Sequence, residues 1–376
     1  MSTFSIPTKA SVIYASLSNL TTQATNSTVS SNREAVQDLT ILVPLLLCCI
    51  VVFLIGVPGN MMVIHVLGIK HRANRNNDGD VFIVSLAVAD LLASATVPLV
   101  IAHDLLSNHT WYLGEFLCHL LPVLNPVTLV TSSWALVVIS AERYRIISRP
   151  FSARLSRKAK AILIASVWIF ALAVNIPLAE QIRYHDIQQC TVDLYPPAEQ
   201  IAYASFFIVA GWLLPGAVLS TLYFHTAVQL RSSEEHHSET HVMQLQIRRE
   251  NKRVVRMFVI IIALFFVFTM PFAIYQITFS YLFLFELHVI RKNTFLSKLY
   301  LILPCISAMN SCFNPLVYAK MHKEVNRYIR RTCLKIPWIG RVHQTRCQGI
   351  MRDSLQKSST KMDSFVSGVQ GKPSLA

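Results

Sequence analysis

The chain has 376 residues, of which 53% are hydrophobic and only 14% charged, and it carries a formal net charge of +14. Soluble proteins average about 45–50% apolar and about 25% charged residues, so this chain has too few charges to cover a globule in water. The composition excludes an ordinary soluble protein and predicts one that is embedded in lipid.

The first 38 residues form a leader rich in Ser and Thr. It contains no apolar core like that of a cleaved signal peptide, so we expect the first membrane span to act as the insertion signal. Glycosylation sequons begin at Asn19 and Asn26. We therefore predict residues 1–38 to be an extracellular, glycosylated and disordered N-terminus.

Seven segments have the roughly 20 mostly apolar residues that a helix needs to cross the hydrocarbon core. They are residues 39–67, 81–106, 116–139, 161–178, 201–230, 254–285 and 299–318. Polar residues dilute the third segment, and because polar groups are costly in lipid we expect it at the bundle centre. The prediction is an all-α, seven-transmembrane helical bundle over 39–320. A short amphipathic helix on the cytoplasmic membrane surface (321–334) and a disordered tail (335–376) follow.

The basic residues are distributed unevenly along the chain. All but six of the 34 Lys and Arg lie in segments that an N-out topology places in the cytoplasm. Such a bias orients membrane proteins, so it predicts a multi-pass plasma-membrane protein with an extracellular N-terminus. It also identifies clusters such as Arg154, Arg157, Lys158 and Lys160 as topology signals and contacts for anionic membrane lipid, not as a nucleic-acid site.

Two of the eight cysteines fall outside the cell in this topology, Cys118 at the start of the third span and Cys190 in the second external loop. Because the exterior is oxidising, we predict a Cys118–Cys190 disulfide that holds the loop over the mouth of the bundle. The alternative is two free thiols.

Each predicted span carries residues that a purely apolar helix would not need. In chain order they are Gly59-Asn60, Leu86-Ala87-Val88-Ala89-Asp90, Glu142-Arg143-Tyr144, Trp168, Pro215, Pro271 and Asn314-Pro315-Leu316-Val317-Tyr318. As an ordered set, from about Asp38 to Cys333, they resemble the rhodopsin-like (class A) G-protein-coupled receptors, and neuropeptide receptors in particular. The resemblance implies a receptor rather than an enzyme, one that couples a ligand to a heterotrimeric G protein.

Asp90 is an ionisable group deep in a span, which signals function and requires a partner. Oxygen-bearing residues on the facing helices are Ser132, Asn310, Ser311 and Asn314. The resemblance implies that this set holds an allosteric sodium ion, and oxygen ligands suit a hard cation. The alternative is a protonated Asp90 in a hydrogen-bonded cluster without an ion. We expect no other cofactor.

The resemblance implies that Arg143 is released from its neighbouring carboxylate on activation and then meets the G protein. Residues with matching positions in this activation and coupling machinery are Glu142, Tyr144, Phe151, Tyr223, Phe265, Pro315 and Tyr318. Phe151 would insert into the G protein, and Tyr223 and Tyr318 would swing toward Arg143. The alternative for Arg143 is one more positive charge on the cytoplasmic side.

The sequence departs from the family at two positions. Thr269 stands where the family usually has a Trp, so we expect activation to rely on Phe265 and Phe268. Asn251 stands where a Glu often pairs with the Arg of the third span. We therefore expect measurable signalling without ligand.

Two single residues exclude two ligand classes: Asn125 replaces the Asp of amine receptors, and Ala308 replaces the retinal-binding Lys of opsins. Asn125 and Gln276 match positions where carboxamides bind the terminal amide of amidated peptides. Acidic residues gather on the external side, with Asp104, Asp193, Glu199 and Glu286 as candidate contacts for a cationic ligand. We predict a receptor for an amidated, Arg-containing neuropeptide of RF-amide or RY-amide type. The alternatives are a receptor for a lipid or small molecule and, remotely, a seven-span transporter.

After the last span, residues 321–333 mix basic and apolar side chains, which is typical of a helix on the membrane surface. Cys333 is then a candidate for palmitoylation, the alternative being an inert thiol. The Ser-rich tail is a candidate substrate for receptor kinases and, once phosphorylated, a binding site for arrestin.

Overall fold

The computed structural model describes residues 42–70, 80–107, 110–149, 154–185, 189–193, 196–235, 242–285 and 294–333. Several predicted features lie outside this part of the chain: the leader with Asn19 and Asn26, the coupling residue Phe151, the acidic residue Glu286 and the tail. The predictions made for them therefore stay predictions.

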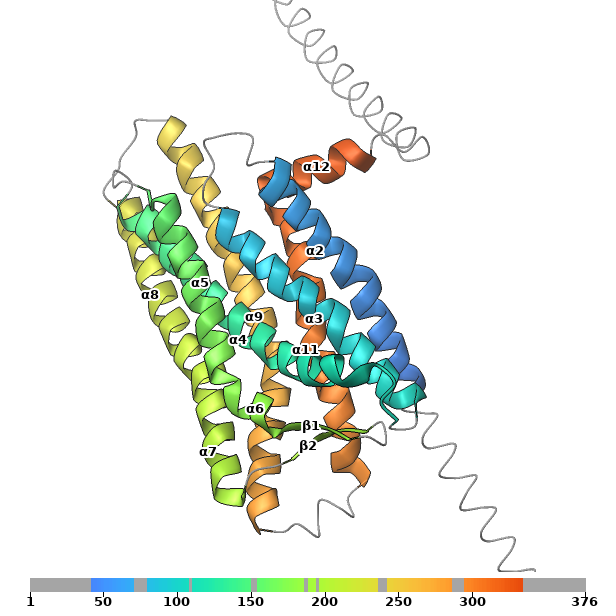
Figure 1. The fold of residues 1–376 in the computed structure, drawn as a ribbon. Coiled ribbons are helices and arrows are strands. Elements are labelled where there is room, and N and C mark those ends of the chain that lie inside the picture. The colour runs from blue at the N-terminus through green and yellow to red at the C-terminus, as the bar shows by residue number, and fades with distance from the viewer. Residues whose placement is uncertain are drawn as a thin grey trace, which may run out of the picture.

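Seven long helical segments run side by side (Figure 1). The first, Leu42–Ile69, contains the π-helical turn η1 (Val52–Gly56), α2 (Val57–Val63) and the start of η2 (Ile64–Lys70). The next three are α3 (Val81–Leu106), α4 (Gly114–Ser148) and α5 (Arg157–Val174), the last continuing into α6 (Ile176–Gln181). The remaining three are α7 (Pro197–Ile208) with η4 (Val209–Leu213) and α8 (Leu214–Glu235), then α9 (Val242–Phe285) and α11 (Thr294–Met321). The predicted seven-helix bundle is confirmed.

Six of the seven segments in the described chain are long and apolar enough to cross a membrane by composition alone. The seventh, α11, is also a long and mainly apolar helix, although it carries the polar residues Ser307, Asn310, Ser311 and Asn314. The expected place of the third span at the centre is also confirmed. In the apolar 18-residue window of α4, 67% of the residues are buried. In the corresponding window of the segment that begins with α5, 17% are buried.

A two-stranded antiparallel hairpin closes one end of the bundle, a feature absent from the all-α prediction. Strand β1 (Ile182–His185) pairs with β2 (Gln189–Val192), with Ile182 opposite Val192. A disulfide joins Cys190 in β2 to Cys118 at the start of α4, as predicted. We call this the disulfide end of the bundle.

The opposite end carries α12 (Lys323–Cys333), which lies across the bundle instead of continuing α11 (Figure 1). Val325 is fully buried, and Tyr328 packs edge-on against the ring of His65 in η2 with the ring centroids 6.0 Å apart. Arg330 and Arg331 are exposed. The predicted amphipathic helix is therefore present, and we call its side of the bundle the α12 end.

Two of the motif residues serve mainly to hold helices together. Asn60 donates from Nδ2 to the carbonyl oxygen of Ser311 at 2.9 Å, which ties the first helix to α11. Trp168 donates from Nε1 to Oγ of Ser85 at 3.1 Å, which ties α5 to α3. Because unpaired polar groups are costly in an apolar interior, these bonds fix how the helices face one another.

Candidate functional site

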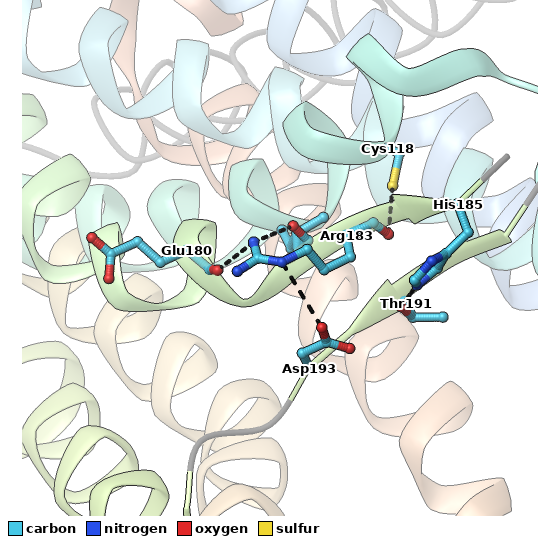
Figure 2. A network of polar contacts seen from close by, with 7 residues as sticks. Cys118, Glu180, Arg183, His185, Thr191 and Asp193 are labelled. Carbon is cyan, nitrogen blue, oxygen red and sulfur yellow. Dashed lines mark hydrogen bonds and ion pairs between the residues drawn. The ribbon is translucent and has the colours of Figure 1, made fainter.

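At the disulfide end, Arg183 of β1 organises the polar contacts of the hairpin (Figure 2). Its Nη1 donates to the carbonyl oxygen of Glu180 at 2.7 Å, and its Nε lies 3.9 Å from Oδ2 of Asp193. Both side chains of this ion pair are more than half exposed. Exposed ion pairs contribute only about 0–1 kcal/mol to the stability of a protein. A charged ligand can therefore replace either partner at little cost in free energy.

The hairpin is anchored to the bundle beneath it. Ile182 is fully buried in an apolar cluster with Trp111 and Leu121. The backbone N–H of Asp193 donates to the carbonyl oxygen of Gln181 at 2.7 Å. His185 and Thr191 lie within hydrogen-bonding distance across the strands, at 3.1 Å (Figure 2). Together with the disulfide, these contacts hold the acidic side chain of Asp193 over the bundle.

The other acidic residues predicted to contact a ligand come from separate elements. Asp104 lies partly buried in the last turn of α3, and Glu199 is exposed in the first turn of α7. Both turns belong to the disulfide end, as Asp193 does. These three acidic residues therefore lie on three different elements at the disulfide end of the bundle.

Below the mouth, Asn125 lines a cavity of about 20 Å³ between α3, α4, α9 and α11. A space of this size holds about one water molecule. The other lining residues are Ala93, Thr128, Leu129, Ser132, Phe265, Ser307, Ala308, Asn310 and Ser311. Gln276 does not line it, because it lies 11 residues further along α9. The structure thus separates the two carboxamides that the sequence grouped together.

Asp90 is the centre of a buried polar cluster that includes three of the other predicted residues, Ser132, Ser311 and Asn314. Its carboxylate accepts hydrogen bonds from Oγ of Ser311 at 3.1 Å and from Nδ2 of Asn314 at 2.7 Å. Ser132 on α4 also interacts with it. In the described chain, Oδ1 of Asn310 and Oδ1 of Asn314 are buried without a hydrogen-bond partner. Three helices, α3, α4 and α11, thereby supply polar side chains to the cluster around Asp90.

This cluster fits a monovalent cation. Asp90 is 1% exposed, and no basic side chain in the described residues forms an ion pair with it. An isolated buried carboxylate is unstable unless a proton or a cation neutralises it. The unpartnered amide oxygens of Asn310 and Asn314 are ligands of the kind that a hard cation accepts.

At the α12 end, Arg143 is held by an aromatic ring. Its guanidinium carbon lies 5.8 Å from the ring centroid of Phe258, and among the described residues its Nε has no hydrogen-bond partner. Tyr223 accepts a 3.4 Å hydrogen bond from Oγ of Ser140, and the hydroxyl of Tyr318 is buried without a partner in the same part of the chain. Arg143 and Tyr318 therefore retain unused hydrogen-bonding capacity.

The neighbouring carboxylate, Glu142, pairs with a residue that sequence reasoning assigned elsewhere. Its Oε1 lies 3.6 Å from Nζ of Lys160 on α5, and the two side chains are 7% and 3% exposed. The prediction that Lys160 contacts anionic lipid is therefore wrong, whereas Arg154, Arg157 and Lys158 are exposed. Helix α5 begins just before Lys160, and its first turn directs this side chain toward α4.

Sequence reasoning also missed Trp212 in η4. This side chain is 1% exposed, and its Nε1 donates to Oγ1 of Thr269 on α9. A Trp inside a membrane span needs a partner for its N–H group, which was the available signal. Of the two residues expected to compensate for Thr269, Phe265 lines the central cavity and Phe268 stacks on Phe313 with ring centroids 4.9 Å apart.

Comparisons with known proteins agree with this arrangement. Residues 59–318 match the family model described as 7 transmembrane receptor (rhodopsin family). Somatostatin receptor type 5 of Rattus norvegicus is 28% identical over 304 residues, which is 78% of each chain. A QRFP-like peptide receptor of Branchiostoma floridae is 26% identical over 291 residues, 74% of each chain. Melanin-concentrating hormone receptor 1 of Macaca mulatta is 28% identical over 280 residues, covering 70% of this chain and 74% of that protein.

Proposed function

Because this chain belongs to the rhodopsin family of G-protein-coupled receptors, we propose that it is the receptor for an amidated, Arg-containing neuropeptide of RF-amide or RY-amide type. The observation that carries the proposal is the neutral carboxamide of Asn125 in the central cavity, whose lining in the described chain contains no Lys, Arg or His. A terminal amide can exchange hydrogen bonds with that side chain. A free terminal carboxylate beside Asn125 would lose its hydration without gaining a basic side chain as partner, which is costly.

The acidic mouth supports the Arg-containing part of the ligand. Asp104, Asp193 and Glu199 lie on three elements at the disulfide end. The exposed ion pair between Arg183 and Asp193 contributes little to stability. An arginine of the ligand can therefore take the place of Arg183 beside Asp193. Of the relatives, one is named a QRFP-like peptide receptor; at 26% identity this name favours a peptide without identifying it.

Asn125 also weighs against the alternative of an acidic lipid ligand. A lipid acid would require a basic partner in the cavity, and the described lining residues supply none. The transporter alternative is excluded, because the family to which the chain belongs is a receptor family.

The proposed orientation of the receptor in the membrane follows from the distribution of its basic residues. The disulfide end faces the outside of the cell with the N-terminus, and the α12 end faces the cytoplasm, where Arg143 meets the G protein. The exposed Arg330 and Arg331 of α12 contact anionic lipid. Receptor kinases and arrestin act on the Ser-rich tail.

The test is a calcium and cAMP screen of expressed receptor against paired peptides that end either in an amide or in a free acid. We expect the amidated peptide to act at a concentration at least about tenfold lower, which corresponds to about 1.4 kcal/mol. Asn125→Ala should remove most of this preference. Thr278→Ala is the control, because Thr278 is exposed on α9 and bonds only within its own helix.

Equal potency of the amide and the acid on the wild-type receptor would contradict the proposal. So would a response to lipids or amines alone. Arg143→Ala should abolish the response while leaving surface expression intact, which separates a failure of coupling from a failure of ligand recognition.

A further inference from the structure

Three thiols that the proposed receptor function does not use meet where the first helix packs on α11. Cys48 and Cys49 belong to the first helix, and Cys305 belongs to α11. The Sγ atom of Cys305 lies 2.9 Å from Sγ of Cys48 and 3.7 Å from Sγ of Cys49. Cys49 and Cys305 are buried, whereas Cys48 is partly exposed on the side of the first helix.

The arrangement of the three thiols limits the chemical roles that this cluster can have. In the described residues no group of three His, Cys, Asp or Glu side chains has the arrangement to hold a metal ion, so metal binding is not favoured. Simple apolar packing leaves heavy atoms about 3.5–4.0 Å apart. The 2.9 Å separation of Cys48 and Cys305 is shorter and exceeds a disulfide bond of about 2.05 Å by only about 0.9 Å.

We propose that Cys48 and Cys305 are a redox-sensitive pair, which hydroperoxides dissolved in the membrane convert into a disulfide between the first helix and α11. The proposal needs no ligand and is independent of the peptide assignment. The remaining thiol of this region, Cys312, contacts the carbonyl oxygen of Val52 at 3.5 Å. It therefore has a partner of its own.

The reaction takes place in two balanced steps. The Cys48 sulfur attacks the terminal oxygen of the hydroperoxide and the O–O bond breaks. The thiol proton passes to the departing alkoxide, so that the products are an alcohol and a Cys48 sulfenic acid. The Cys305 sulfur then attacks the Cys48 sulfur, and the hydroxyl group leaves with the Cys305 proton as water. The hydroperoxide is the oxidant, and the two thiols together lose two electrons and two hydrogens.

The exposure of the two residues assigns their roles. Cys48 is the partly exposed thiol, so it is the one that meets an oxidant arriving from the lipid. Cys305 is 1% exposed and reaches only its neighbours, so it resolves the sulfenic acid. The product fixes the first helix to α11, the same helix from which Ser311 and Asn314 hold Asp90.

The experiment treats membranes that contain the full-length receptor with cumene hydroperoxide, followed by alkylation of free thiols, proteolysis and mass spectrometry without reduction. We expect a linked pair of peptides containing Cys48 and Cys305, lighter by about 2 Da than the sum of the free peptides. Reduction should separate them. The link between Cys118 and Cys190 should be present before and after treatment, which confirms that the receptor is folded.

Cys48 and Cys49 are adjacent and share a peptide, so substitutions identify the reacting thiol. Cys48→Ser and Cys305→Ala should abolish the new link, whereas Cys49→Ser and Cys312→Ser should retain it. A link that survives in Cys48→Ser would overturn the proposal. Cys48 oxidised to sulfinic acid beside an unmodified Cys305 in the wild-type receptor would also overturn it, and this result needs no variant to fold.

Discussion

Nε1 of Trp212 donates a 2.9 Å hydrogen bond to Oγ1 of Thr269, and this threonine donates in turn to the carbonyl oxygen of Phe265 at 2.7 Å. The chain of bonds joins η4 to α9 through the interior of the bundle, where Trp212, Thr269 and Phe265 are each at most 1% exposed. Thr269 stands where related receptors usually carry a Trp. In this receptor the indole of Trp212, from a neighbouring helix, contacts that threonine.

Thr269→Val should lower the thermal stability of the purified receptor. The valine keeps the shape of the threonine but leaves the N–H of Trp212 buried without an acceptor, which costs about 1–3 kcal/mol. The measurement is the melting temperature in detergent. In a receptor that already carries Trp212→Phe the hydrogen-bond donor is absent. The same valine substitution should then lower the melting temperature clearly less. Equal losses in the two backgrounds would show that the hydrogen bond does not matter.

Lys160→Met should destabilise the receptor by about 3–5 kcal/mol, because it removes the buried ion pair of Glu142 with Lys160 and leaves its carboxylate less compensated. The fraction of receptor that survives brief heating in membranes measures the effect. Adding Glu142→Gln to Lys160→Met should restore much of the lost stability. The control, Lys158→Met, changes an exposed lysine of the same turn and should stay within about 0.5 kcal/mol of the wild type. A stable Lys160→Met receptor would refute the assigned pair.

Sodium chloride should lower ligand-free G-protein activation relative to choline chloride at the same ionic strength. The reason is that we propose a sodium ion at the Asp90 cluster, and expect it to favour the arrangement of helices without bound ligand. Asp90→Asn removes the charge and should abolish the difference between the two salts. Nucleotide exchange on the G protein in membranes is the readout, with receptor-free membranes as the control. An equal salt effect in Asp90→Asn would place the ion elsewhere.

Asn251→Glu should reduce signalling in the absence of ligand. It supplies a carboxylate at the position that related receptors pair with the arginine of the third span, and Nε of Arg143 has no hydrogen-bond partner among the described residues. Accumulation of the second messenger at matched surface expression tests this. Asn251→Gln has nearly the same size without the charge and should leave basal signalling unchanged. Similar effects of both substitutions would point to side-chain size as the cause.

Much of the architecture could be predicted from the sequence because its signals are local or ordered along the chain. Apolar runs long enough to cross a bilayer mark the spans, and the family motifs appear one by one in them. The pairing of Cys118 with Cys190 followed from topology, since few thiols were placed outside the cell. The Asp90 cluster followed from the resemblance, and the structure brings its members together.

The unpredicted features are contacts between distant residues. The hairpin consists of two four-residue strands, too short for alternation to stand out beside seven apolar helices. Lys160 lies among basic residues that are exposed, and only the rotation of α5 against α4 turns it inward to Glu142. Asn125 and Gln276 are both carboxamides on central helices, yet only Asn125 reaches the cavity.

Sequence alone therefore determined that this chain spans the membrane seven times, which family it belongs to, and which cysteines close its mouth. The tertiary structure decided which side chains meet: Trp212 with Thr269, Lys160 with Glu142, and Cys48 with Cys305. The physical reason is that the pattern of a helix specifies which residues share a face. The tilt, rotation and depth of each helix, which packing of the whole bundle sets, specify what that face touches.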